Sequence, residues 1–271
     1  MQRLLTLLFH DVYAHSVAES GFPGPAAARY KLSLPDFERQ LEGMTGVLDG
    51  KPILIRGAGS AMPETGLPLA LTVDDGGRSF YTQVADRLER RGWRGHCFVT
   101  TGCIGRRGFL DAHELRELHA RGHVIGSHSV SHPSRFAAGS WDEMLAEWRD
   151  SRRALEDILG AQVRVASVPG GYFMPRAARA AEAAGISALF TSEPRLRVGH
   201  VDGCMVLGRY TVRRGAAPDF TARLVAARGA LRFREWAVWN GKGVLKTLLG
   251  AAYPRLASYA GRAGFEQASD A

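Results

Sequence analysis

Residues 67–76 read LPLALTVDDG, an apolar run that ends in two adjacent carboxylates and a glycine. The continuous apolar part predicts a buried strand. Phe80, Val84 and Leu88 follow at helical spacing, and Gly92 is the residue type that commonly ends a helix. The stretch therefore predicts a strand that is followed by a helix.

The same alternation of strand and helix extends along the chain in both directions. Capping boxes begin two predicted helices, at Asp111 with Glu114 and at Ser140 with Glu143. Further strands are predicted at 4–9, 96–101, 123–127, 163–168, 187–192 and 205–212, and helices at 35–47, 141–159 and 175–185. This regular alternation predicts right-handed crossovers and a parallel sheet.

A parallel sheet can stay open or close into a barrel. No GxGxxG sequence follows a strand, which counts against an open dinucleotide-binding sheet. The sequence also has no short-period repeat. We expect an α/β fold, a distorted (β/α) barrel of fewer than eight strands over residues 1–215, with a basic helical C-terminal extension over residues 216–271.

Composition excludes several classes of protein. Apolar residues make up 45% of the 271 residues and charged residues 23%, which excludes intrinsic disorder and collagen-like repeats. Cys97, Cys103 and Cys204 are an odd number without a CxxC pair, so we expect a reducing compartment and no zinc ribbon. No apolar run approaches the ~20 residues of a membrane span, and His10 and Asp11 interrupt the apolar start. These features predict a cytoplasmic protein.

The basic charge is concentrated near the C-terminus. The formal net charge is +8, but 31 of the 35 basic residues are Arg beside abundant Ala and Gly, so we expect no nucleic-acid partner. Residues 221–271 hold eight Lys and Arg against three Asp and Glu, together with Trp236, Trp239, Tyr253 and Tyr259. Such a segment can contact an anionic membrane surface or a phosphate-bearing substrate. The alternative is an ordinary helix packed on the main domain.

Asp74 and Asp75 follow directly after the apolar run of the strand predicted at 67–73. Reactive groups of barrel folds gather at the carboxyl ends of the strands. Adjacent residues of a strand point in different directions, so one carboxylate can bind a cation while the other acts as a base. The alternative is an Asp-Asp-Gly turn that caps the next helix.

His128 and His132 follow the predicted strand at 123–127. Two imidazoles four residues apart can bind one metal ion, Zn²⁺ or a similar first-row ion, with a carboxylate from another strand. An HxxxH pattern alone is a weak signal. His119 and His123 share the spacing but lie toward the opposite side of the sheet, so we expect them to be structural.

Two further strand ends carry candidate site residues. Gly170 lies in the turn SVPGG of residues 167–171, where a backbone N–H can approach a developing oxyanion closely. Pro-Gly-Gly is also an ordinary tight turn. His10 ends the first strand and can serve as a general acid, although a lone histidine is more often structural.

TVDDG, HSVSH and SVPGG, in this order and spacing, resemble the motifs of the polysaccharide deacetylase family, the NodB-homology or carbohydrate esterase 4 group. The resemblance covers residues 67–191. It implies a distorted (β/α) barrel in which Asp74 is the catalytic base and Asp75, His128 and His132 bind a divalent metal ion. Zn²⁺ is the expected ion, with Co, Ni and Mn as alternatives. Removal of an acetyl group from an N-acetylated glycan or a lipid-linked glycan precursor is the implied reaction.

The sequence departs from the family pattern at two places. Ser167 stands where the family usually has an Arg that braces the catalytic Asp. The late motif that ends in a general-acid His is also absent, because the strand at 205–212 offers Arg209 and Tyr210 instead. LLFHD at residues 7–11 resembles the N-terminal His motif of the biofilm poly-N-acetylglucosamine deacetylases, whose motif order is circularly permuted.

By that likeness His10 supplies the acid, with His200 as the next candidate. Gly170, Gly171 and Tyr172 are the expected oxyanion and substrate residues. Two other readings stay open from sequence alone. One is a related hydrolase that acts on a non-sugar amide, such as a formamide or a cyclic imide. The other is a non-catalytic glycan-binding protein with the same fold.

Overall fold

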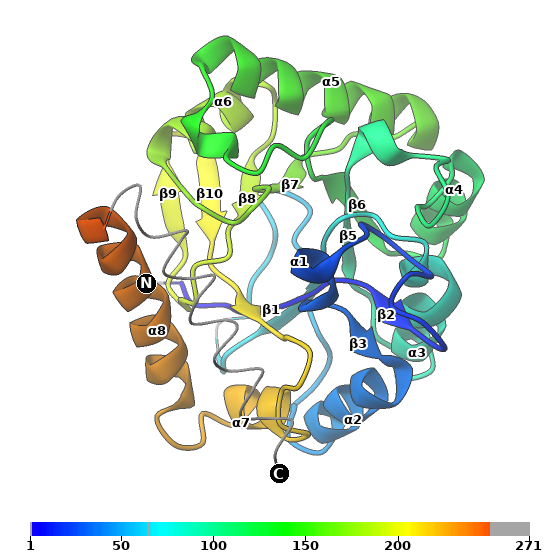
Figure 1. Ribbon diagram of the computed structural model, residues 1–271, viewed down its shortest axis with the longest axis vertical. Helices are drawn as coiled ribbons and strands as arrows, with labels where there is room; N and C mark the ends of the chain where they lie inside the picture. The colour runs from blue at the N-terminus through cyan, green and yellow to red at the C-terminus, as the bar shows by residue number, and fades with distance from the viewer. Residues whose placement is uncertain (1, 64, 250–271) are drawn as a thin grey trace.

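A nine-stranded sheet curls into an incomplete barrel in the computed structural model, which describes residues 2–63 and 65–249 (Figure 1). The strand order is β11-β1-β4-β5-β6-β7-β8-β10-β9, and every neighbouring pair is parallel except β9 and β10. The strands of this sheet are β1 (Leu5–Phe9), β4 (Leu69–Val73), β5 (His96–Val99), β6 (Val124–Ser127), β7 (Val165–Ser167), β8 (Ala188–Phe190), β9 (Gly199–Val201), β10 (Cys204–Leu207) and β11 (Tyr210–Thr211). A second, parallel pair consists of β2 (Val12–Tyr13) and β3 (Leu32–Ser33). The predicted α/β barrel is confirmed.

The predicted single strand at 205–212 is wrong, because the chain breaks it at Gly208 and Arg209. β10 pairs with β8 and β9, whereas β11 pairs with β1 at the other end of the sheet. The three Cα steps from Leu207 to Tyr210 reach at most ~11 Å, so the two sides of the curled sheet approach each other there. A Cβ atom on Gly208 would lie 2.4 Å from the carbonyl oxygen of Glu193, and glycine is therefore needed at this close approach. The break and the antiparallel β9 raise the strand number above the fewer than eight that we expected.

Most helices surround the sheet on its outer side, whereas the short helix Pro25–Ala28 lies near the centre of the view and contributes to the lining of a cavity there (Figure 1). The two predicted capping boxes are present, and Ser33 caps the helix predicted at 35–47. The helices are α1 (Pro25–Ala28), α2 (Leu34–Thr45), α3 (Ala85–Glu89), α4 (Ala112–Ala120), α5 (Trp141–Leu159), α6 (Pro175–Ala183), α7 (Phe220–Val225) and α8 (Leu231–Leu249), with a π-helical turn at Phe80–Val84 and 3-10 turns at Thr101–Cys103 and Phe136–Ala138.

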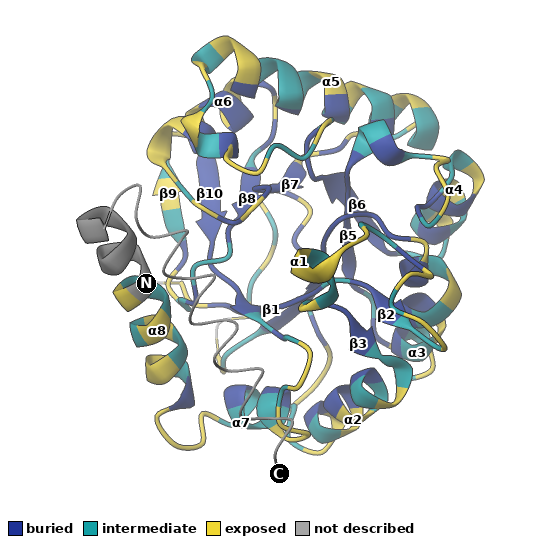
Figure 2. Cartoon of the chain, viewed as in Figure 1, coloured by how far each residue is buried: buried dark blue, intermediate teal, exposed yellow. Residues whose placement is uncertain are grey.

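Alternating side chains of the strands divide the core into an inner and an outer part. Leu71 and Val73 of β4 pack outward in the cluster that includes α2 and α3, whereas Ala70 packs inward with Phe98 and Phe190. Figure 2 shows the strands as mostly buried, with exposed residues on the outer surfaces of the helices. The barrel interior is therefore filled by side chains, and a cavity can form only at an end of the strands.

The C-terminal helices begin against the barrel. Thr221 of α7 donates a hydrogen bond from its hydroxyl to the carbonyl oxygen of Gln40 in α2, at 2.8 Å, and Leu224 belongs to the outer core. α8 follows at the side of β9 and β10 in Figure 1. Tyr253 and Tyr259 lie outside the described residues, and the division at residue 215 stays a prediction. No helix in the described part of the chain has the length and apolarity needed to cross a membrane.

Candidate active site

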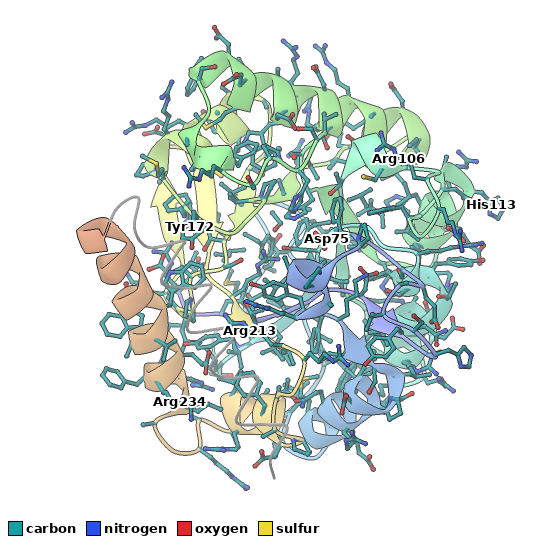
Figure 3. The ribbon with its side chains drawn as sticks, in the orientation of Figure 1. Asp75, Arg106, His113, Tyr172, Arg213 and Arg234 are labelled. Atoms are coloured by element: carbon teal, nitrogen blue, oxygen red, sulfur yellow. The ribbon has the colours of Figure 1, made fainter. Side chains whose placement is uncertain are left out.

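The polar ends of four strands meet at one cavity of about 340 Å³. Its lining includes residues that follow β1, β4, β6 and β7, namely His10, Asp74, Asp75, His128, His132, Gly170 and Gly171. Figure 3 labels Asp75 near the centre of the barrel in this view. Tyr172 is 47% exposed, and its ring centroid lies 5.9 Å from that of Trp239, an α8 residue that lines the cavity. The structure thus places the sequence-predicted site residues in or beside one cavity.

Asp75, His128 and His132 form a compact group of potential metal ligands. Their ligand atoms all lie within 4.8 Å of one another. The Asp75 Oδ1 atom is 3.6 Å from Nε2 of His128 and 3.5 Å from Nε2 of His132. Asp75 and His132 both have positive φ angles, of 78° and 54°, a backbone conformation that costs about 1–3 kcal/mol in non-glycine residues and is often found at active sites.

The surroundings of this group fit a divalent cation. Nδ1 of His128 donates a hydrogen bond to the carbonyl oxygen of Ser167, at 2.8 Å, which leaves Nε2 unprotonated toward Asp75. Burial lowers the pKa of His128 to about 3 and also lowers the pKa of His132, so both rings are neutral ligands at neutral pH. Burial and the charges of Asp11 and Asp74 raise the pKa of Asp75 well above its usual range, a cost that a bound cation would offset.

Arg209 forms a buried bidentate ion pair with Asp74. The Nη1 atom lies 2.7 Å from Oδ1 of Asp74, and the Nη2 atom lies 2.8 Å from Oδ2. Arg209 Nη2 also donates to Oγ of Ser167, which in turn donates to Asp74. Burial acts to raise the pKa of Asp74, but the guanidinium group outweighs it and holds that pKa below its usual range. Asp74 is therefore ionised at neutral pH.

This ion pair is the functional feature that was not predicted from the sequence. The small side chain of Ser167 stands where a bracing Arg was expected, and Arg209 reaches the same carboxylate from the connection between β10 and β11. The sequence did contain an indication: Arg209 lies between the apolar segment of β10 and Tyr210, at a position that is expected to be buried. A charged side chain at such a position needs a partner of opposite charge. Position in the sequence did not indicate which acid it would meet.

His10 occupies the wall of the cavity opposite a tyrosine. Its ring lies 4.8 Å from the ring of Tyr30, and its buried Nδ1 atom has no hydrogen-bond partner. Burial lowers the pKa of His10 to about 4, and the nearby Asp74 partly opposes that shift. Asp11 follows His10 and accepts hydrogen bonds from the hydroxyls of two serines, Ser20 and Ser79.

The other histidines that were considered lie elsewhere. Nε2 of His123 is 2.9 Å from the Glu89 carboxylate, and Nδ1 accepts from the N–H of Gly95, so His123 is structural as expected. His200 is in β9, at the edge of the sheet, and lines a separate cavity with Arg195 and Arg197. It cannot replace His10 as the acid.

The fold and the cavity define a class of protein: an α/β barrel with an Asp-His-His ligand group and a braced carboxylate at the carboxyl ends of its strands. Residues 62–189 match the sequence model of the polysaccharide deacetylase family. This part of the chain is therefore similar to a polysaccharide deacetylase domain. The match ends before Arg209 and begins after His10, the two site residues that come from the flanking segments.

A curated relative is similar to part of the chain. The Bacillus subtilis protein YxkH, whose name places it provisionally among polysaccharide deacetylases, is 25% identical over 124 residues, which are 46% of this chain. Those residues are 44% of YxkH, so the match spans less than half the length of this curated relative.

Three solved structures share the fold. The deacetylase PplD of Streptococcus pyogenes, solved in complex with acetate, has a TM-score of 0.67 at 19% identity over 83% of this chain and 98% of its own. IcaB from Ammonifex degensii has a TM-score of 0.63 at 23% identity over 83% of this chain and 97% of its own. A polysaccharide deacetylase from Bacillus cereus has a TM-score of 0.68 at 16% identity over 82% of this chain and 68% of its own.

The ligand group leads to a prediction about metal content. His128→Ala or His132→Ala removes one of three ligands, so each variant is expected to lose most of its bound first-row metal while it still folds. Elemental analysis of purified protein measures this, and circular dichroism checks the fold. His113→Ala, at an exposed position of α4, is the matched control and should keep its metal. Full occupancy in both ligand variants would show that the site is misassigned.

The ion pair leads to a prediction about stability. Arg209→Met leaves the Asp74 carboxylate buried without its cation and should lower the free energy of unfolding by about 3–5 kcal/mol at neutral pH. Asp74→Asn combined with Arg209→Met should cost much less than the sum of the two single changes. Urea denaturation of the four proteins gives the coupling energy, and additive effects would contradict the pairing. Because the pKa of Asp74 is lower in the folded chain, the contribution is present at neutral pH and is lost on acidification below the ordinary range of an aspartate.

Proposed function

We propose that the chain is a metal-dependent hydrolase that removes the acetyl group from an N-acetylated amino sugar of a glycan or a glycan precursor. The observation that carries the proposal is the position of Asp74, an ionised carboxylate in the same cavity as the ligand group of Asp75, His128 and His132. Its family match and its fold support a deacetylase. Zn²⁺ is the proposed ion, because two imidazoles and one carboxylate suit it.

Asp74 acts as the base in the proposed reaction. A bound divalent cation would lower the pKa of a water molecule toward ~7 and polarise the acetyl carbonyl group. Asp74 takes the proton from the attacking water. Arg209 lowers the pKa of Asp74, which has two effects. The carboxylate is ionised at neutral pH and can accept a proton, but it is a weak base. It can therefore deprotonate only a water molecule whose own pKa has been lowered.

The turn after β7 provides the oxyanion contact. Gly170 and Gly171 have φ angles of 68° and 72°, and a Cβ atom on Gly170 would lie 2.9 Å from the carbonyl oxygen of Ser134. The N–H of Gly171 donates to Val168 within the turn. Gly170 and Gly171 both line the cavity, and the N–H of Gly171 is already engaged. We therefore assign the N–H of Gly170 as the donor to the developing oxyanion.

His10 is the proposed acid that protonates the leaving amine. With a pKa of about 4, the ring is neutral at neutral pH before substrate binds. Negative charge that develops on the reacting acetyl group favours the protonated ring. Protonated Asp74 is a strong acid because its pKa is low, so it releases the proton of the attacking water, and His10 takes up this proton as the reaction proceeds. It can then donate this proton to the amine nitrogen. Tyr172 and Trp239 form an aromatic wall on which a sugar ring can pack.

The exposed side of α8 supports a proposed peripheral contact with an anionic membrane on the cytoplasmic side, where a lipid-linked precursor would be met. Phe233 is 66% exposed, its ring lies 5.7 Å from that of Trp236, and Arg234 is exposed between them. Aromatic and basic side chains of this kind bind the interface of anionic bilayers. Sedimentation with phosphatidylglycerol vesicles tests the contact, which is refuted if Phe233→Ala with Trp236→Ala binds as well as wild type.

The metal-loaded protein should release acetate from short N-acetylglucosamine oligomers. Asp74→Asn cannot accept the proton, so kcat should fall by about 10²- to 10⁴-fold while the metal is retained. Acetate is measured by a coupled assay, and metal content on the same preparation. Activity of the variant within threefold of wild type would disprove the role of Asp74. Turnover of a formamide or cyclic imide without any release of acetate would favour the non-sugar amide hydrolase, and no turnover of any amide would favour a glycan-binding protein.

His10→Ala should retain metal and lose rate chiefly on amides. An amine is a poor leaving group that needs a proton, whereas an activated acetyl ester leaves almost without one. The ratio of the losses in kcat on an N-acetyl sugar and on an aryl acetate measures the acid role. Equal losses on both substrates would mean that His10 only positions the acetyl group or supports the fold.

A further inference from the structure

Arg213 differs from the other charged residues that line the active-site cavity. Asp74 is paired with Arg209, and Asp75 belongs to the proposed metal ligand group. Arg213 forms no ion pair with any described residue, and its Nε atom is buried without a hydrogen-bond partner. Glu235 of α8 borders an adjoining hollow that Arg213 also lines, but the two side chains are not paired. The cavity therefore contains an uncompensated guanidinium group.

Strand geometry directs Arg213 into the cavity. β11 pairs with β1 in parallel, with Thr211 opposite Leu8, and the N–H of Val212 donates to the carbonyl oxygen of Leu8. Side chains alternate along each strand, so Thr211 and Arg213 share one side while Val212 packs in the outer core. Leu8 and His10 line the same cavity by the same alternation. Figure 3 labels Arg213 beside β11.

An arginine that is partly removed from water without an anion is costly, and an incoming anion would regain that energy. The planar guanidinium group matches phosphate and carboxylate oxygens through paired hydrogen bonds. We propose that Arg213 binds an anionic substituent, a phosphate or a carboxylate, of the amino-sugar substrate. This inference rests on the proposed deacetylase function and narrows its substrate to a negatively charged N-acetylated sugar.

The position of Arg213 determines where the proposed substrate carries its anionic substituent. Arg213 and His10 come from neighbouring strands, and Trp239 lines the same part of the wall in both hollows. A sugar ring that packs on Trp239, with its acetamido group toward His10 and the ligand group, would carry its anion on the side of β11. The substituent is thus on the same sugar unit that is deacetylated, or on the atom that links this unit to its carrier.

Calorimetric titration of the metal-loaded protein tests the inference without turnover. The ligands are glucosamine, glucosamine 1-phosphate and a disaccharide of glucuronic acid and glucosamine. At least one anionic ligand should bind more than tenfold tighter than glucosamine, and Arg213→Ala should weaken that ligand by about 10- to 100-fold. Arg214→Ala, at the exposed neighbouring position, is the control and should bind like wild type. The favoured anionic ligand identifies phosphate or carboxylate as the source of the charge.

Two outcomes would overturn the inference: equal binding of neutral and anionic ligands by wild type, or a preference that survives in Arg213→Ala, in which case the bound cation holds the anion. Acetate release from the corresponding N-acetylated compounds is measured in parallel. If none releases acetate, the proposed function fails, while the titration still decides whether Arg213 is an anion site. If the neutral compound is deacetylated as well as the anionic ones, and binding shows no preference, only the inference fails.

Discussion

The buried ion pair between Arg209 and Asp74 connects the fold with the site. Arg209 also donates to the carbonyl oxygen of Thr191 after β8, to the hydroxyl of Thr72 in β4 and to the hydroxyl of Ser167 in β7. One side chain therefore contacts three strands or strand ends from inside the barrel. Its own backbone lies at the connection where the sheet nearly closes. A charge can be buried here only because each of its donors meets an acceptor. The same contacts that satisfy the guanidinium group fix the carboxylate on which the proposed chemistry depends.

Asp75 of the ligand group, unlike Asp74, has no arginine partner among the described residues. Asp74 and Asp75 are neighbours in the chain, yet the positive φ of Asp75 turns its carboxylate toward the two imidazoles, away from Arg209. One carboxylate has a resident cationic side chain, and the other belongs to the candidate metal-ligand group. Two acids of the same type thereby take opposite pKa shifts, and the difference comes from what each one faces.

Much of the fold could be predicted from local sequence, because apolar runs and capping residues act over a few positions. The ligand group was predictable for a related reason: parallel strands bring their carboxyl ends to one edge, so Asp75 and His128 had to be near each other. Arg209 was not predictable in this way. Its pairing with Asp74 depends on the break at Gly208, after which the chain leaves β8 and pairs with β1 at the other end of the strand order. No short sequence pattern specifies this change of partner.

The pairing of β11 with β1 also determines when the site can exist. During synthesis the first strand precedes the residues after 208, so a nascent chain that ends near residue 200 already contains Asp75, His128 and His132 but neither Arg209 nor β11. Asp74 is then a carboxylate without its counter-ion. Pairing of the late segment with the earliest strand brings Arg209 to Asp74, so the base of the proposed reaction can be ionised and fixed only after residues far beyond the ligand group have been added.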